Sequence, residues 1–450
     1  MGKLFGTDGV RGVANKELTV ELAYDLGQAG ARVLSLENKH KPVILIGKDT
    51  RISCDMLEGA LIAGMNSVGA DVISVGVIPT PAIAYLTTKY KADAGVVISA
   101  SHNSFEFNGI KFFNNAGYKL SDEIEDEIEE IIFNKLSDSF EKPIGKLVGR
   151  HYYNATAKED YINHLIENNS IDLSGCRIAL DCANGASFEV AQMLFEKLGA
   201  TLSIIHNEPD GVNINHNCGS THLENLIKHV VDTHSDIGFA FDGDADRLLA
   251  IDEKGNVIDG DAIMAIIAKD MLSKDKLPSK TLVVTVMSNM GLEIAAKREG
   301  FQLVRTAVGD RYVLEEMIRG GYTLGGEQSG HIICLDNNTT GDGLLSALLV
   351  MKILATGDKK PSEMAAIVHS LPQVIRNAKV SNQKKYDYLK DEIIAEKCKN
   401  LEDEFAGEGR VLIRPSGTEP LVRVMIEGAD QQVLNQKADE LVRIIEERLL

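Results

Sequence analysis

The strongest constraint on the fold is an order of elements that occurs three times along the chain. Each time, an apolar strand-like run ends in a polar loop, a helix-like segment closes on a glycine, and a second strand follows. After another helical segment, each stretch ends in a third strand and a second polar loop. Strands that alternate with helices in this way predict βαβ units and a largely parallel sheet. The first strands are Val43–Gly47, Ile178–Cys182 and Leu282–Met287, and the closing glycines are Gly69, Gly199 and Gly300.

The last part of the chain has a different pattern. Helix-like segments cover Tyr386–Lys399 and Asp430–Leu449, and strand-like runs cover Gly409–Ile413 and Leu421–Glu427. This pattern predicts a smaller α+β domain with an antiparallel sheet. We therefore expect three tandem related α/β domains with mixed, largely parallel sheets plus a smaller C-terminal α+β domain, around a central cleft. The expected domains are 1–153, 154–253, 254–368 and 369–450.

Charge and composition limit the classes of function. The formal net charge is −19 and no dense run of Lys and Arg occurs, whereas a nonspecific nucleic-acid binder needs a basic surface. We therefore expect no nucleic-acid partner. No stretch approaches the roughly 18 uninterrupted apolar residues of a spanning helix, and Met1–Asp8 lacks the apolar run of a secretory signal. We expect a soluble, cytoplasmic protein with no membrane partner.

The cysteines add little to the sequence-based picture. Six of them are scattered along the chain, with no CxxC pair and no histidine at zinc-finger spacing. This usage is typical of small packing residues in a chain without a disulfide framework.

The sharpest motif is the acidic loop Phe241–Arg247, which reads Phe-Asp-Gly-Asp-Ala-Asp-Arg. Three carboxylates at alternate positions can converge on one hard cation. A calcium hand is the competing interpretation, because Glu253 falls at the twelfth position. However, Arg247 occupies the sixth position, where that loop needs glycine, and strands rather than helices flank it. The loop therefore predicts a Mg²⁺ site with coordination positions left for a phosphoryl oxygen and water.

Two other polar loops follow strand-like runs. Ser99–Asn103 comes directly after Ala94–Ile98 and places the Ser101 hydroxyl at a strand end, where open α/β sheets bind ligands. A serine hydroxyl needs activation, and the chain lacks the GxSxG elbow of hydrolases. Gly325–His331 sets a carboxylate, a hydroxyl and an imidazole between glycines. Taken alone, each loop is equally consistent with a structural turn.

A fourth loop, Arg414–Pro420, has the composition of an anion site. It reads Arg-Pro-Ser-Gly-Thr-Glu-Pro and is followed by Arg423. Glycine beside two hydroxyl residues can form a backbone nest for an anion, and the two arginines can supply charge-assisted hydrogen bonds. The alternative is a hairpin turn with surface arginines.

Taken together, the four loops resemble the four signature loops of the α-D-phosphohexomutase superfamily, in the same order. Further segments resemble the branch of that superfamily that acts on glucosamine phosphates, and the match covers nearly the whole chain. These segments are Phe5–Gly12, Val212–Asn215, Cys218–His222, Val308–Tyr312 and Thr339–Gly343.

The resemblance implies an enzyme, an intramolecular phosphotransferase that interconverts glucosamine 6-phosphate and glucosamine 1-phosphate. This reaction lies on the route to UDP-N-acetylglucosamine and the cell wall. Ser101 would carry the phosphoryl group, and one Mg²⁺ would be held by that phosphate with Asp242, Asp244 and Asp246. Glucosamine 1,6-bisphosphate would be the intermediate and activator. The partner would be a small phosphosugar, and a homodimer is left open.

The same resemblance assigns roles around the reacting phosphate. Lys111, Arg247 and Arg11 would offset its charge, and His102 would shape the serine loop. The group that transfers the proton is left open among Lys111, His331 and Arg11.

The resemblance also implies how the sugar is held. Glu327 and Ser329 would bind its hydroxyl groups in both orientations. The residues expected to bind the phosphate that does not react are Arg414, Ser416, Gly417, Thr418 and Arg423. Two positions depart from the usual family pattern: Ser104 stands where proline is common, and Ala245 where the branch has glycine. Neither change removes a ligand, so we expect altered rates rather than lost chemistry.

Two rival hypotheses remain at this point. The first is a phosphomannomutase/phosphoglucomutase, which would perform the same chemistry on another hexose; Gln328 and Cys218–His222 favour the glucosamine branch. The second is a non-catalytic phosphosugar-binding protein, which would need neither Ser101 nor the three aspartates.

Overall fold

The computed structural model describes residues 4–6, 8–35, 40–405, 407–416 and 420–450. The chain divides into two compact units. The first contains Met1–Met287 and Phe301–Ile367, and the second contains Ser288–Gly300 and Val368–Leu450. No helix among the described residues has both the length and the apolar content to cross a membrane.

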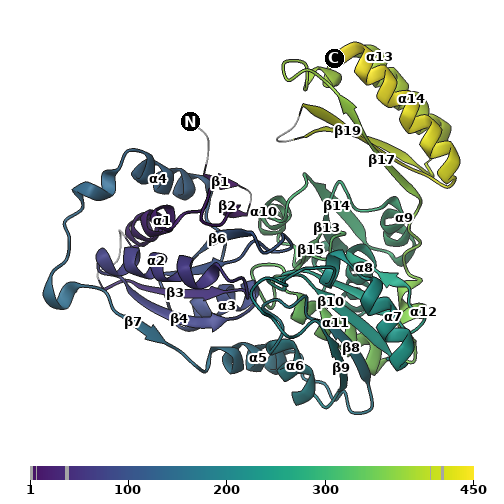
Figure 1. The fold of residues 1–450 in the computed structure, drawn as a ribbon. Coiled ribbons are helices and arrows are strands. Elements are labelled where there is room, and N and C mark those ends of the chain that lie inside the picture. The colour runs from purple at the N-terminus through teal and green to yellow at the C-terminus, as the bar shows by residue number, and fades with distance from the viewer. Residues whose placement is uncertain (1–3, 7, 36–39, 406, 417–419) are drawn as a thin grey trace. The chain divides into compact units, whose positions relative to one another are not determined.

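The first sheet of the larger unit has seven strands, in the order β1-β2-β6-β5-β3-β4-β7. The strands β5, β3, β4 and β7 run parallel, and β6, β2 and β1 extend the sheet in antiparallel fashion. Helices α1, α2 and α4 pack on one face and α3 on the other (Figure 1). The strands are β1 (Phe5–Gly6), β2 (Gly9–Val13), β3 (Val43–Lys48), β4 (Asp71–Val77), β5 (Ala94–Ile98), β6 (Phe107–Asn114) and β7 (His151–Tyr153), and the helices are α1 (Val20–Val33), α2 (Cys54–Ser67), α3 (Thr80–Lys89) and α4 (Asp122–Phe133).

Covering helices explain why the central strands are apolar along their whole length. All five residues of β5 are buried, as expected for a parallel strand covered on both faces. The polar residues therefore come immediately after the strand ends, where the loops leave the sheet.

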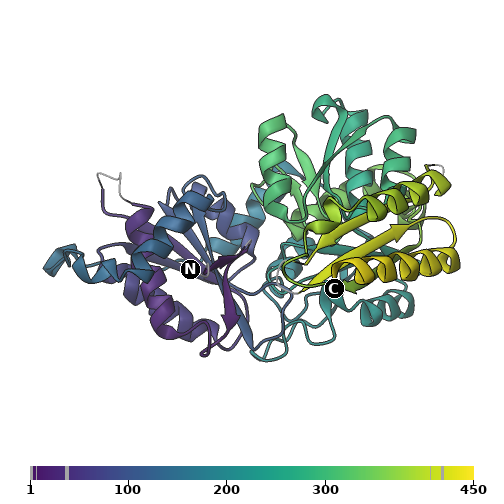
Figure 2. The same ribbon diagram turned by 90° about the horizontal axis from the view of Figure 1, so that it is seen from above.

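The second sheet has the order β12-β11-β10-β8-β9, and the third has the order β14-β13-β15-β16. Both are parallel in the middle and antiparallel at one edge. Figure 2 shows these two sheets, in teal and green, beside the purple first sheet. The second sheet contains β8 (Arg177–Asp181), β9 (Thr201–Ile205), β10 (Ile237–Phe241), β11 (Leu248–Asp252) and β12 (Val257–Ile258), with α5 (Ala157–Asn168), α6 (Val190–Lys197) and α7 (Glu224–Thr233). The third contains β13 (Thr281–Thr285), β14 (Gln302–Thr306), β15 (Leu324–Gly326) and β16 (Ile332–Cys334), with α8 (Gly260–Ser273), α10 (Asp310–Gly320), α11 (Gly343–Thr356) and α12 (Pro361–Ala365).

The smaller unit contains a three-stranded antiparallel sheet with the order β17-β19-β18. Its strands are β17 (Gln373–Lys379), β18 (Arg410–Pro415) and β19 (Leu421–Glu427), and its helices are α9 (Met290–Glu299), α13 (Glu392–Phe405) and α14 (Gln431–Leu449). Helices α13 and α14 share one apolar core with the sheet. The predicted helix over Tyr386–Lys399 starts later than expected, because the Asp391 carboxylate accepts hydrogen bonds from the Ile393 and Ile394 amides and caps α13.

Helix α9 is tied to the C-terminal sheet by one buried carboxylate. Glu427 on β19 accepts hydrogen bonds from the Met290 amide, at 3.1 Å, and from Arg410 Nε, at 2.6 Å. The Asn289 carboxamide also exchanges hydrogen bonds with the backbone of Leu371. A segment from the middle of the sequence therefore belongs to the C-terminal unit.

The fold class predicted from the sequence is confirmed: three α/β sheets of mixed direction precede a small C-terminal α+β domain. The three glycines expected to stop helices follow α2, α6 and α9, and all three have positive φ, at 98° for Gly69 and 88° for Gly199 and Gly300. The four domain boundaries and the central cleft stay predictions.

Candidate active site

Ser101 lies three residues beyond the end of β5, in a loop with an unusual backbone. Its φ is +51°, in the left-handed region, and only 2% of the residue is exposed. Its carbonyl accepts hydrogen bonds from Arg51 Nη2, at 2.9 Å, and Asn215 Nδ2, at 2.8 Å. Its Oγ donates to Asp242 Oδ2 at 2.7 Å and lies 3.3 Å from His102 Nδ1. The serine hydroxyl is therefore aimed at the acidic loop of the second sheet.

The acidic loop begins directly after β10. One carboxylate oxygen each from Asp242, Asp244 and Asp246 lie within 4.8 Å of one another, and all three residues are buried. Oδ1 of Asp244 and Oδ1 of Asp246 have no hydrogen-bond partner. Burial and the two neighbouring carboxylates raise the pKa of Asp242 well above its usual value. Unpartnered buried oxygens in a cluster of like charge are suited to a hard divalent cation, so the donor set fits Mg²⁺.

Lys111 comes from β6, which runs antiparallel to β5. Its Nζ lies 2.9 Å from Asp244 Oδ2 and 3.1 Å from Asp8 Oδ2. Burial opposes the charged form, but the charges of Asp244 and Asp8 outweigh it and raise the pKa of Lys111. The Lys111 ammonium therefore stays charged and can donate hydrogen bonds to an anion.

Two arginines near the site have unused donors. Arg11 pairs with Asp8 through Nη2, and Arg247 lies 3.9 Å from Asp246 Oδ1 through Nε. Nε of Arg11 and Nε of Arg247 are buried without a hydrogen-bond partner. Two guanidinium groups with unsatisfied donors match a phosphoryl group.

The loop Gly325–His331 lies against the acidic loop. His331 pairs with Arg247 across an isolated antiparallel bridge, and its Nδ1 lies 3.6 Å from Asp246 Oδ2. Burial opposes protonation of His331, but Asp246 and Asp310 raise its pKa. Glu327 accepts a hydrogen bond from the Gly309 amide at 3.2 Å, whereas Ser329 is exposed.

The fourth loop lies on the smaller unit. Arg414 on β18 stands directly opposite Arg423 on β19, and burial together with the charge of Arg423 lowers the pKa of Arg414. Ser416 is buried at the end of β18. The remaining predicted phosphate ligands, Gly417 and Thr418, lie outside the described residues.

Several residues that reach this site were not singled out from the sequence. Thr80 Oγ1 donates to Asp244 Oδ2 at 2.7 Å, and Arg51 and Asn215 hold the serine loop. Lys119 lies 2.8 Å from Asp8 and 2.6 Å from Asp310. Asn215 and Asp310 lie in segments that resemble the glucosamine-phosphate branch, whereas the sequence signal for Arg51 and Thr80 was only their position in polar loops after strands.

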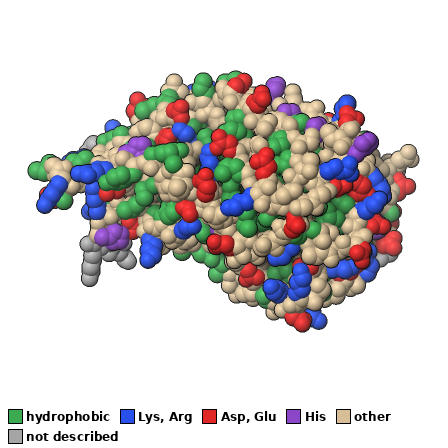
Figure 3. All heavy atoms as spheres, turned by 90° about the horizontal axis from the view of Figure 1, so that it is seen from below, with side chains coloured by type: hydrophobic (Ala, Val, Ile, Leu, Met, Phe, Trp, Pro, Cys, Tyr) green, Lys and Arg blue, Asp and Glu red, His purple; other side chains and the backbone are tan. Residues whose placement is uncertain are grey.

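The face of the molecule drawn in Figure 3 shows acidic and basic side chains interspersed. No broad basic field dominates this face. The positive charge of the candidate site is instead local, in buried or half-buried side chains such as Lys111, Arg11 and Arg247.

Comparison with known proteins supports the architecture along the whole chain. Family models of phosphoglucomutase/phosphomannomutase match four successive parts: α/β/α domain I at residues 2–139, domain II at 159–255, domain III at 259–371 and the C-terminal domain at 376–444. Fold and loops thus define a phosphohexomutase architecture.

Comparison with individual relatives identifies the branch of the family. The phosphoglucosamine mutase of Ruminiclostridium cellulolyticum is 63% identical over 449 residues, with 100% of both chains covered. The chain belongs to the phosphoglucosamine mutase family.

Solved structures share the fold at lower identity. A phosphoglucomutase/phosphomannomutase family protein from Burkholderia thailandensis superposes with a TM-score of 0.82 at 24% identity, covering 99% of this chain and 98% of the other. N-acetylphosphoglucosamine mutase from Aspergillus fumigatus, in complex with GlcNAc-6P and magnesium, has a TM-score of 0.69 at 18% identity, covering 99% and 96%.

Proposed function

We propose that this protein interconverts glucosamine 6-phosphate and glucosamine 1-phosphate through a phosphoserine at Ser101. The observation that carries the proposal is the 2.7 Å hydrogen bond from Ser101 Oγ to Asp242, beside two carboxylate oxygens without partners. The proposal is also supported by the full-length identity to phosphoglucosamine mutases.

The reaction consists of two phosphoryl transfers. Phosphorylated Ser101 gives its phosphoryl group to O1 of glucosamine 6-phosphate. The O1–P bond forms as the Oγ–P bond breaks, and the O1 proton passes to Ser101 Oγ, which is left as a free hydroxyl. The resulting 1,6-bisphosphate turns around and returns its 6-phosphoryl group to Ser101, which releases glucosamine 1-phosphate. Both transfers depend mainly on positive groups that offset the charge of the phosphoryl oxygens and on the alignment of the attacking and leaving oxygens.

Residues of this chain supply positioning and positive charge. Asp242, Asp244 and Asp246 would hold Mg²⁺, which when bound offsets charge on phosphoryl oxygens. Lys111 and the unpartnered Nε donors of Arg11 and Arg247 would bind the transferring group. Because two carboxylates keep Lys111 charged, we assign it hydrogen bonding to the bisphosphate oxygens rather than proton transfer.

Other groups would bind the sugar and the second phosphate. Glu327 and Ser329 would bind hydroxyl groups, His102 would orient the serine loop, and His331 would fix Asp246. On the smaller unit, Arg414 and Arg423 are two cations in register, and an anion between them would relieve their repulsion. That proposed phosphate site is completed by Ser416, Gly417 and Thr418.

The partner is a small phosphosugar rather than nucleic acid or a membrane, and a homodimer stays a prediction.

Ser101→Ala separates catalysis from binding. We expect this variant to lose turnover, because no hydroxyl remains to carry the phosphoryl group, while sugar-phosphate binding measured by calorimetry persists. Ser104→Ala, at an exposed serine of the same loop, is the matched control and keeps its activity. Mutase turnover in Ser101→Ala would contradict the phosphoserine mechanism. Intact mass spectrometry of the wild-type protein should show the added mass of one phosphate, and peptide mapping should locate it in Ser99–Lys111.

Substrate identity needs a separate measurement. We expect a higher kcat/KM for glucosamine 6-phosphate than for mannose 6-phosphate or glucose 6-phosphate. Faster turnover of either neutral sugar would assign the chain to phosphomannomutase/phosphoglucomutase chemistry instead.

A further inference from the structure

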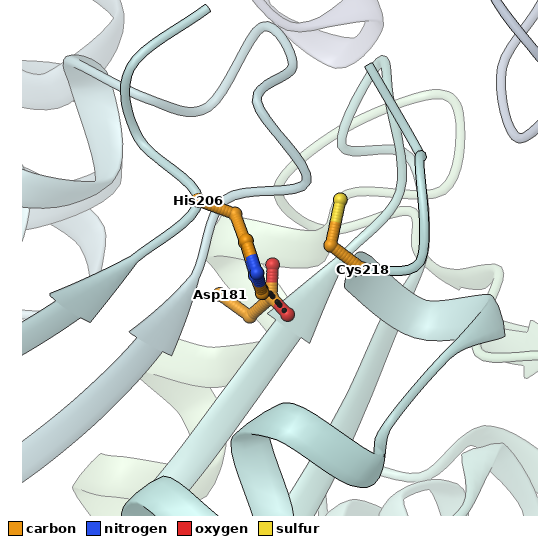
Figure 4. Close-up of side chains that lie close together, drawn as sticks. All are labelled: Asp181, His206 and Cys218. Carbon is orange, nitrogen blue, oxygen red and sulfur yellow. Dashed lines mark hydrogen bonds and ion pairs between the residues drawn. The ribbon is translucent and has the colours of Figure 1, made fainter. Parts of the chain in front are cut away.

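A second group of metal-ligating side chains lies in the second sheet, apart from the three-aspartate loop. Asp181 ends β8, His206 follows β9, and Cys218 precedes the 3₁₀ turn Gly219–Thr221. One potential ligand atom from each lies within 4.8 Å of the others. Figure 4 shows the imidazole against the Asp181 carboxylate, with the Cys218 side chain next to the pair. Asp181 and Cys218 are fully buried, and His206 is half-buried.

Among the described residues, the basic side chain that faces the buried Asp181 carboxylate is His206. Oδ1 accepts a hydrogen bond from the Ala183 amide, and Oδ2 accepts one from the Gly219 amide. The ion-pair contact of Asp181 is with His206 Nδ1 at 2.9 Å, and within the described residues no lysine or arginine forms an ion pair with it. A buried carboxylate needs an opposite charge, which a protonated imidazole or a metal ion can supply.

Three positions in the loops around this group have a left-handed backbone. His206 has a φ of +49°, and Ala183 has a φ of +52°, conformations that cost non-glycine residues about 1 kcal/mol or more. Gly219 has a φ of +70°, and a Cβ there would lie 2.5 Å from the Phe241 carbonyl oxygen. These loops are therefore closely fitted around the group.

We infer that Asp181, His206 and Cys218 form a Zn²⁺ site, separate from the proposed Mg²⁺ site and independent of the proposed reaction. Imidazole nitrogen and thiolate sulfur favour Zn²⁺, whereas three carboxylates favour Mg²⁺. Three protein ligands leave the fourth tetrahedral position for water. Zinc bond lengths of about 2.0–2.3 Å place ligand atoms roughly 3.2–3.8 Å apart, so atoms that lie up to 4.8 Å apart must approach one another by up to about 1.6 Å.

Proton release is part of this binding event. Burial and the charge of Asp181 raise the pKa of the Cys218 thiol to about 12, and the hydrogen bond to Asp181 raises the pKa of His206. Zinc must displace the thiol proton and bind neutral imidazole.

The site has a structural consequence for the serine loop. Cys218 lies three residues after Asn215, whose amide donates to the Ala183 carbonyl and whose side chain donates to the Ser101 carbonyl. Asp181 lies close to Ala183 in sequence, and Cys218 lies close to Asn215. A zinc ion bound to both side chains would therefore hold together the two segments that the Asn215–Ala183 hydrogen bond joins. The metal would stabilise the support behind Ser101 without contacting the substrate.

Cobalt spectroscopy of the full-length protein tests the ligand set. In excess Mg²⁺, which fills the carboxylate site, we expect one equivalent of Co²⁺ to give a thiolate-to-cobalt charge-transfer band that Zn²⁺ removes. The band should be absent in Cys218→Ser and present in Cys176→Ser, a control cysteine at the start of the same strand region. It should also persist in Asp244→Asn, because that variant affects only the carboxylate site.

Two outcomes would overturn the zinc site. The first is a wild-type protein without the charge-transfer band, and the second is a band that survives in Cys218→Ser. Zinc titration against a coloured chelator adds a second variant: His206→Gln should weaken zinc affinity at least about tenfold. Zinc should also raise the melting temperature of the wild-type protein but not of Cys218→Ser, and equal shifts in both would count against the site.

Discussion

At the scale of single residues, the loop of Ser101, the proposed phosphate carrier, is held by side chains that are distant in sequence. Its left-handed backbone is held by donors from two different domains, Arg51 and Asn215. Arg51 is itself buried and paired with Asp49. A neutral hydrogen bond such as that from Asn215 contributes about 0.5–1.5 kcal/mol, and one from the charged Arg51 contributes about 1.5–3 kcal/mol. Several moderate contacts therefore hold the serine loop in place.

Asn215→Ala should slow turnover without weakening substrate binding. The change removes the bonds to the Ser101 and Asn103 carbonyls, while Arg51 still bonds to both. We expect kcat to fall about tenfold, equivalent to about 1.4 kcal/mol, with KM nearly unchanged in steady-state kinetics. Asn213→Ala is the control, because Asn213 bonds within its own loop. Equal kcat values for both variants would contradict a positioning role for Asn215.

Residue chemistry could be predicted from the sequence where it is local. The alternation of Asp242, Asp244 and Asp246 predicted one cluster, and the structure brings them together. The partners Arg51 and Asn215 could not be predicted, because their bonds to Ser101 span 50 and 114 residues. For the same reason, the sequence did not predict that Asp181, His206 and Cys218 lie close together, and their spacing matches no zinc motif.

At the scale of elements, two loops at the ends of β8 and β10 meet backbone to backbone. A Cβ built on Gly185 would lie 2.4 Å from the Gly243 carbonyl oxygen and 2.8 Å from the Gly243 Cα. The Ala186 amide donates to that same carbonyl. The acidic loop is therefore positioned by the loop of the neighbouring strand.

Gly185→Ala should weaken Mg²⁺ binding by displacing the acidic loop. Because the contact atoms are backbone, we expect a loss of about 1–3 kcal/mol in the free energy of unfolding, together with a higher Mg²⁺ requirement for activity. Gly59→Ala is the control: it is exposed on α2, and its added Cβ meets nothing within 4 Å. A Gly185→Ala protein with the wild-type Mg²⁺ titration would refute the role of this contact.

The positions of the strands along the chain were predicted better than the pairing of strands within the sheets. Periodicity and the glycine stops located β3, β8 and β13 to within two residues at each end. The antiparallel placement of β6 beside β5 could not be predicted, because a pairing direction has no local pattern. That pairing is what brings Lys111 to the acidic loop.

At the scale of the larger unit, one lysine links parts of the chain that are far apart in sequence. Lys119 contacts Asp8 near the N-terminus and Asp310 at the start of α10. Burial opposes ionisation of both carboxyls, but Lys119 and the neighbouring cations lower the pKa of each. Their stabilising effect is therefore present above the unfolded pKa, near 3.9, and is lost as pH falls through the lower folded values.

Lys119→Met should destabilise the protein in a pH-dependent manner. We expect a loss of about 2–3 kcal/mol at pH 7, the scale of hydrogen bonds between charged groups, measured by urea denaturation. The difference from the wild-type protein should shrink as pH falls below about 4. Lys16→Met, at an exposed lysine, is the control. A difference that stays constant down to acidic pH would show that the carboxylates are not responsible.

The tie between α9 and Glu427 also bears on the order in which the chain is made. Ser288–Gly300 leaves the ribosome long before Val368–Leu450, yet both belong to one compact unit. During synthesis, Asn289 and Met290 cannot form their hydrogen bonds to Glu427 until β19 has left the ribosome. A gene fragment that encodes only the C-terminal part therefore encodes an incomplete domain, and circular permutation between these two segments would separate them further.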